Sequence, residues 1–183
     1  DLALPDYTSK IINVGIQQKG VESEIIDKMT DKTYANINSL TSVDLSKYYK
    51  KVPKTDANIE KYSYLKDGDV YVLKGELSED DKKSILDSTI IYSFLLNNDA
   101  IKQMGIDINP TTIEYYTKSD TNNFDEYLTS FNNLDESMKK QYAISFISSE
   151  YERLGINLKD LQMKQQKKVV GEWLNMIIEK NGQ

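Results

Sequence analysis

SEDDKKSILDSTIIYSFLLN, residues 78–97, is the stretch that decides the fold. Ser78 is a residue type that caps helix N-termini, and Asp81 follows at the capping-box position. The acidic residues 79–81 favour the positive end of a helix dipole. The second half of the stretch is apolar on nearly all sides, so the sequence predicts a long helix to about Asn97 at the centre of the core.

Further helices are expected on both sides of this central helix. The spacing of apolar residues and capping residues predicts them at 6–18, 24–29, 32–40, 43–50 and 124–133, from Asp135 to Leu154, and from Asn157 onward. The helix that follows Asp135 has an apolar face, ends at Gly155 and carries Glu150 and Glu152, which we assign to the solvated surface.

A β-hairpin is expected within KYSYLKDGDVYVLKG, residues 61–75. The segments 62–64 and 70–72 are rich in β-forming residues and flank Asp67-Gly68, a dipeptide of tight hairpin turns. Two strands alone are marginal in stability, and residues 111–117 are a candidate third strand. The expected fold is mainly α (α+β), a helical domain with a small antiparallel β-hairpin or three-stranded sheet.

Composition excludes several classes of function. A chain of 183 residues suits one domain, or one domain plus a small appendage, and its net charge of −6 argues against a nucleic-acid partner. Histidine and cysteine are absent, which removes the commonest general base, nucleophile and metal ligands. Neither a P-loop nor a dinucleotide fingerprint occurs, and no apolar run approaches the roughly 20 residues that cross a bilayer. We therefore expect no enzyme activity, catalytic residue, cofactor site or metal site in this chain.

The beginning of the chain carries more information about function. LALPDYTSKIINVGIQQKGVES, residues 2–23, joins an apolar start to a proline and an expected helix with Gly15 inside it. A glycine there costs about 1 kcal/mol relative to alanine, which indicates close packing at that position.

This stretch resembles the outer end of the first transmembrane helix of certain Gram-positive ABC exporters. The residues that match the general pattern are Leu4, Pro5, Ile11, Ile12, Asn13, Gly15 and Ile16. One subgroup of these exporters inserts a large extracytoplasmic domain before the second transmembrane helix. Its continuing pattern is matched by Ile16, Gln17, Gln18, Gly20, Val21, Glu22 and Ser23.

A second resemblance lies at the end of the implied inserted domain. YERLGINLKDLQM, residues 151–163, is similar to the segment that leads back to the membrane in the same subgroup. The resemblance implies a membrane-proximal stem helix at 1–20, an extracytoplasmic globular domain at 21–155 and a C-terminal return helix at 156–183, with stem and return helices antiparallel. The implied stem residues are Leu2, Leu4, Pro5, Ile11, Ile12, Gly15 and Ile16, and the implied return residues are Tyr151, Gly155, Leu161 and Gln162.

The resemblance implies the function of an extracellular domain in an integral membrane protein, an ABC half-transporter. The domain would contribute to gating, to subunit contact, or to recognition of an exported drug, lipid or peptide. ATP and magnesium would bind a cytoplasmic nucleotide-binding domain outside this chain. The implied partner is a second half-transporter, identical or different, and the implied location is the extracellular face of the cell membrane.

One segment departs from the family pattern. After Met163 the family has an apolar membrane helix, whereas this chain has KQQKKVVGEWLNMIIEKNGQ, residues 164–183, which is amphipathic. Either a different or added segment follows Met163, or the resemblance ends there. The alternative function is a stand-alone secreted or cell-surface helical binding module, in which Leu2 and Leu4 pack in the core.

Overall fold

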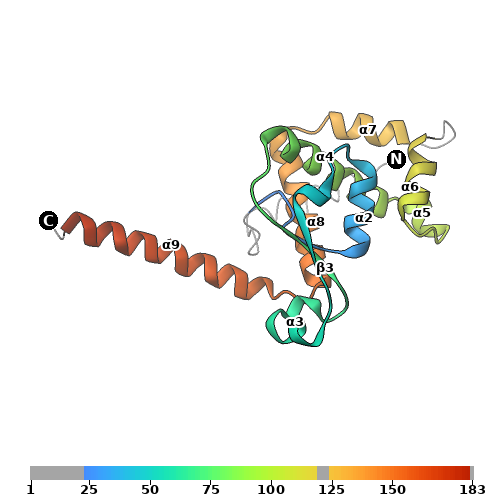
Figure 1. Ribbon diagram of the computed structural model, residues 1–183. Coiled ribbons are helices and arrows are strands. Elements are labelled where there is room, and N and C mark those ends of the chain that lie inside the picture. Colours follow the sequence, from blue (N-terminus) through green and yellow to red (C-terminus); the bar gives the residue numbers. More distant parts are fainter. Residues whose placement is uncertain (1–22, 119–123, 182–183) are drawn as a thin grey trace.

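The computed structural model describes residues 23–118 and 124–181, and within them it is mainly helical with a three-stranded antiparallel sheet (Figure 1). This confirms the expected fold class. The predicted stem helix at 1–20 lies outside the described residues, so its antiparallel pairing stays a prediction. The helices and strands are β1 (Lys28–Thr30), α2 (Asp31–Leu40), η1 (Leu45–Lys47), β2 (Tyr49–Val52), α3 (Asp56–Lys61), η2 (Ser63–Leu65), β3 (Val70–Leu73), α4 (Glu79–Leu96), α5 (Asp99–Gln103), α6 (Pro110–Lys118), α7 (Phe124–Asn132), α8 (Glu136–Arg153) and α9 (Leu158–Asn181).

The central helix is α4, as the sequence predicts. The Ser78 hydroxyl accepts a hydrogen bond from the backbone N–H of Asp81 at 3.2 Å, which caps the first turn. The helix packs against α2, α7 and α8. From Ile85 onward the helix is buried on several sides, through Ile85, Leu86, Ile90, Tyr92, Phe94 and Leu95.

The sheet has the strand order β1-β3-β2, so β3 is its central strand. Tyr71 of β3 lies opposite Met29 on one side and Lys51 on the other. The ring of Tyr34, on α2, stacks on the Tyr71 ring with centroids 3.7 Å apart. One face of the sheet is therefore covered by α2.

The predicted hairpin around Asp67-Gly68 is wrong. Residues 70–73 do form a strand, but residues 63–65 form the short 3₁₀ helix η2 instead of its partner. Both edges of β3 are taken by strands more distant in sequence, β1 and β2. Leu65 is fully buried instead, so η2 contributes to the core.

The candidate third strand at 111–117 is also wrong, because these residues form α6. Asn109 and Thr112 cap it reciprocally: the Asn109 side-chain oxygen accepts from the Thr112 N–H at 3.0 Å, and the Thr112 hydroxyl accepts from the Asn109 N–H at 2.8 Å. Pro110 occupies the first helical position, where its fixed φ favours a helix. This N-terminal chemistry overrides the β propensity of the residues that follow.

Two of the expected short helices are replaced by strands. Residues 28–30 form β1, which overlaps the end of the range expected as a helix at 24–29. In the range 43–50, the Asp44 carboxylate caps the 3₁₀ helix η1 by accepting from the Ser46 N–H, and the chain then enters β2 at Tyr49. Strand pairing with β3 decides both segments.

Candidate functional site: the junction between the two ends of the domain

The predicted return segment begins at Tyr151, in the last turn of α8, and this turn lies against the first strand of the domain. Helix α8 packs against β1. The part of the chain that enters the described domain is thus a neighbour of the part that leaves it. We call the set formed by Asp27, Thr30, Glu150, Tyr151 and Arg153 the junction cluster.

Glu150 is the centre of the junction cluster. Its side chain is fully buried, and its Oε2 accepts from the backbone N–H of Thr30 at 2.9 Å. The Thr30 hydroxyl lies 3.2 Å from the same oxygen. Thr30 is the N-cap of α2, so the buried carboxylate also lies at the positive end of that helix. The expectation that Glu150 belongs to the solvated surface is wrong, whereas Glu152 is exposed as expected.

Arg153, the one arginine of the chain, neutralises Glu150. Its Nε and Nη2 donate to Glu150 Oε1 at 3.0 and 2.8 Å. Its side chain is about half exposed, which lets the charge of the guanidinium remain partly hydrated. The guanidinium carbon also lies 5.8 Å from the centre of the Phe146 ring. Both oxygens of the buried carboxylate therefore have partners.

Two buried tyrosine hydroxyls bond to the entering segment, one from α8 and one from β2. Tyr151 donates a hydrogen bond to the Asp27 carboxylate, and Tyr49 donates to the Ile26 carbonyl at 2.6 Å. Burial is the main cause that raises the pKa of both tyrosines, and the nearby negative charge of Asp27 raises it further. Both hydroxyls consequently stay protonated donors to a higher pH than an ordinary tyrosine does.

Gly155 ends α8 as the sequence predicts. Its φ of +75° is in the left-handed region, and the Gly155 and Ile156 N–H groups donate to the Glu152 and Tyr151 carbonyls at 3.0 and 2.9 Å. These two bonds form a Schellman motif. The Asn157 side-chain oxygen then accepts from the N–H groups of residues 159 and 160, which begins α9.

Helix α9 contains the remaining predicted return residues, Leu161 and Gln162, within its first two turns. Figure 1 shows α9 extending away from the other helices. Among residues 23–118 and 124–181, no helix is both long and apolar enough to cross a membrane. The predicted stem residues, which are Leu2, Leu4, Pro5, Ile11, Ile12, Gly15 and Ile16, lie outside the described residues.

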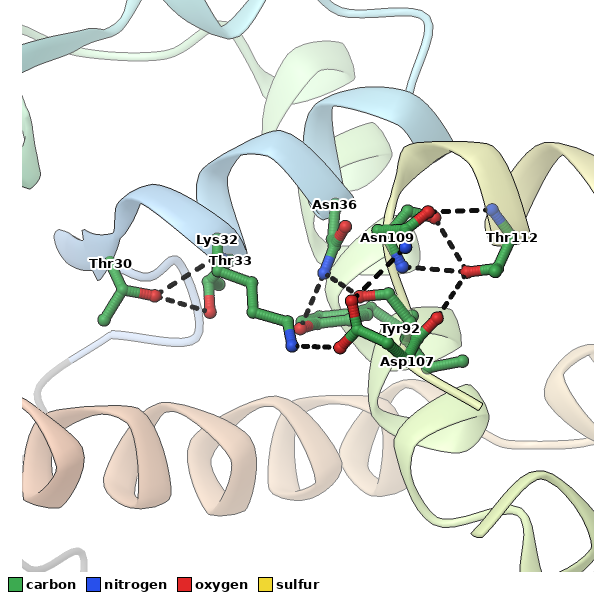
Figure 2. Close-up of polar contacts among 9 residues, drawn as sticks. Thr30, Lys32, Thr33, Asn36, Tyr92, Asp107, Asn109 and Thr112 are labelled. Carbon is green, nitrogen blue, oxygen red and sulfur yellow. Dashed lines mark hydrogen bonds and ion pairs between the residues drawn. The ribbon is translucent and has the colours of Figure 1, made fainter. Parts of the chain in front are cut away.

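A second polar cluster joins α2 to the loop before α6 (Figure 2). The buried amide of Asn36 donates to the Tyr92 hydroxyl and to the Ile108 carbonyl, both at 3.0 Å. At the surface, Lys32 contacts Asp107 at 2.6 Å, and this contact is the largest cause that lowers the Asp107 carboxyl pKa. These bonds fix one element to another, so the cluster serves packing.

The described part of the chain contains no group of three or more His, Cys, Asp or Glu side chains that could hold a metal ion. The junction cluster itself has one fully buried carboxylate, Glu150, and that carboxylate is already bonded to Thr30 and Arg153. The junction cluster therefore has a structural role, which is to connect the two ends of the domain.

Only part of this site is predictable from the sequence. The resemblance indicates Tyr151 and Gly155, whereas nothing in the local sequence reveals the roles of Asp27 and Thr30, and the expectation for Glu150 is wrong. One signal was present, because Glu150 stands three residues after Ile147 on the same helical face, and Arg153 follows at the spacing of a helical ion pair. Comparison with protein-family models, curated proteins and solved structures finds no match to this chain.

Proposed function

We propose that this chain is the extracytoplasmic domain of an ABC exporter half-transporter, inserted between its first two transmembrane helices. The observation that carries the proposal is the junction cluster, in which Tyr151 bonds Asp27 and Glu150 bonds Thr30. An inserted domain must return the chain close to where it entered, because both ends continue into helices that cross the same membrane. The resemblance at residues 2–23 and 151–163 supports the same assignment.

In this proposal the domain acts outside the cell, in gating, in contact with a second half-transporter, or in recognition of an exported drug, lipid or peptide. ATP and magnesium belong to a cytoplasmic nucleotide-binding domain beyond these residues. In this proposal the second membrane helix follows α9 and does not begin at residue 164, since α9 is helical from Leu158 to Asn181 and polar in composition.

The proposal is tested with the full-length product of the parent gene. We expect a membrane span before residue 1, a second span after α9, and a nucleotide-binding domain whose ATP hydrolysis is measurable in the purified protein. A secretion signal before residue 1 and a stop codon near Gln183 would contradict the proposal and favour the secreted binding module.

A deletion variant tests the role of the junction. Residues 24–157 are replaced by a short Gly/Ser linker in the full-length protein. Since the two ends are hydrogen-bonded neighbours, the variant should still insert in the membrane and retain ATP hydrolysis. Loss of membrane insertion would contradict the account, provided that the full-length parent inserts under the same conditions.

A further inference from the structure

The apolar surface of α9 is the feature that the proposed function leaves unexplained. Among the described residues, nine large hydrophobic side chains are exposed. Six of them belong to α9 and are between 47 and 65% exposed: Met163, Val170, Trp173, Leu174, Met176 and Ile178. A surface of this kind marks an interaction site in a protein that otherwise buries its large apolar residues.

The apolar residues in the second half of α9 form one face of the helix. Val170, Trp173, Leu174 and Ile177 follow the spacing i, i+3, i+4 and i+7, which places them on one side of a helix. Glu172, Asn175 and Glu179 recur on the opposite side and are exposed. The second half of α9 is therefore amphipathic, with a wide apolar arc.

The charge of α9 contrasts with the rest of the chain. The helix has five lysines against three carboxylates, whereas the remainder has 18 basic against 26 acidic residues. Three of the lysines, at positions 164, 167 and 168, directly precede the apolar half. A basic segment next to an exposed apolar face with tryptophan is typical of helices that lie in the interface of an anionic bilayer.

A coiled coil with a second copy of the chain is a poorer fit. In the heptad spacing that contains Val170, Trp173 and Ile177, the sequence has glutamine at position 166 and lysine at position 180. Three apolar positions fall well short of the three to four heptads that a coiled coil requires.

We propose that the second half of α9, residues 169–178, binds the surface of an anionic lipid bilayer with its apolar arc in the interface. This inference concerns the 183-residue chain itself and does not require that it belong to a transporter. In this proposal α9 lies on the surface of the bilayer and does not cross it, because the helix is too polar to span a membrane.

Trp173 reports directly on this binding, because it is the one tryptophan of the chain. The chain is mixed with vesicles of phosphatidylglycerol and phosphatidylcholine, or of phosphatidylcholine alone. We expect the Trp173 emission to shift to shorter wavelengths with the anionic vesicles, with affinity at least about tenfold higher than for the neutral ones, and the difference should shrink as salt is added.

Two variants with the same added charge separate the apolar arc from the rest of the helix. Leu174→Glu puts a carboxylate within the arc and should abolish the shift. Asn175→Glu, one residue along on the polar side, should retain it with only modestly weaker binding. Circular dichroism of both variants checks that the helix content is unchanged.

Three outcomes would overturn the proposal. The first is an unchanged emission at excess anionic lipid. The second is a short-wavelength emission in dilute protein without lipid, which would mean that the chain itself, for example residues 1–22, covers the face. The third is a shift that depends on protein concentration without lipid, which would assign the face to a second copy. Because the test uses the isolated chain and lipid alone, its failure is distinguishable from failure of the transporter assignment.

Discussion

The buried carboxylate of Glu150, near the end of α8, accepts a hydrogen bond from the backbone N–H of Thr30. Thr30 is the N-cap of α2, the helix that follows β1. This one contact connects residues 120 positions apart in the sequence. It holds the two ends of the domain together, and Arg153 neutralises the negative charge of the Glu150 carboxylate.

Removal of this carboxylate should be costly. Glu150→Ala leaves the Thr30 N–H without its acceptor and Arg153 without its partner, and we expect the free energy of unfolding to fall by about 2–4 kcal/mol. Urea denaturation measures the change. The matched control is Glu152→Ala, two residues along and exposed, which should change stability by no more than about 0.5 kcal/mol. Equal effects of the two substitutions would mean that the junction cluster does not stabilise the domain.

Stability should decline at alkaline pH because of the buried tyrosines. The pKa of Tyr151 is raised above its value of about 10 in the unfolded chain, so above that pH the unfolded state loses this proton first. The contribution of Tyr151 to the free energy of unfolding is complete below about pH 10 and is lost as the pH rises above that value. The pKa of Tyr49 is also raised, so this residue adds to the loss of stability at alkaline pH.

The variant Tyr151→Phe isolates this effect. It should be less stable than the parent at pH 7, because the bond to Asp27 is lost, and its stability should fall less steeply between about pH 9 and pH 11. Urea midpoints across this range give both quantities. If parent and variant decline with the same slope, the assignment of the alkaline transition to Tyr151 is refuted.

Two glycines in the C-terminal region should respond oppositely to the same substitution. Gly155→Ala forces a side chain into the left-handed region at a φ of +75°, and we expect a loss of about 1–2 kcal/mol although the surrounding space is open. Gly171→Ala lies within α9, also in open space, and should add up to about 1 kcal/mol of local helix stability. Thermal unfolding and circular dichroism measure the two effects, and a destabilising Gly171→Ala would contradict the helical assignment there.

The helices with strong local signals could be predicted from the sequence. Ser78 caps α4, Asp135 caps α8, and Gly155 and Asn157 mark the end of one helix and the start of the next. Each of these signals acts within a few residues, so it is visible in a short window of sequence.

The sheet and most of the junction could not be predicted in this way. Strand β3 pairs with segments around Met29 and Lys51, and its nearer neighbour at residues 62–65 is left without strand pairing. Local β propensity does not reveal which of several segments will pair. Glu150 was missed because carboxylates are rarely fully buried, and its partner Thr30 is distant in sequence.

A single cysteine tests most directly our proposal that this domain lies outside the cell, held by two neighbouring ends. The chain has no native cysteine, and Met104 is 63% exposed, so Met104→Cys provides one accessible thiol. The variant is expressed as the full-length protein in intact cells, with cysteines outside these residues replaced, and treated with a membrane-impermeant maleimide. The account predicts labelling of intact cells that does not increase on permeabilisation, whereas labelling only after permeabilisation would contradict it.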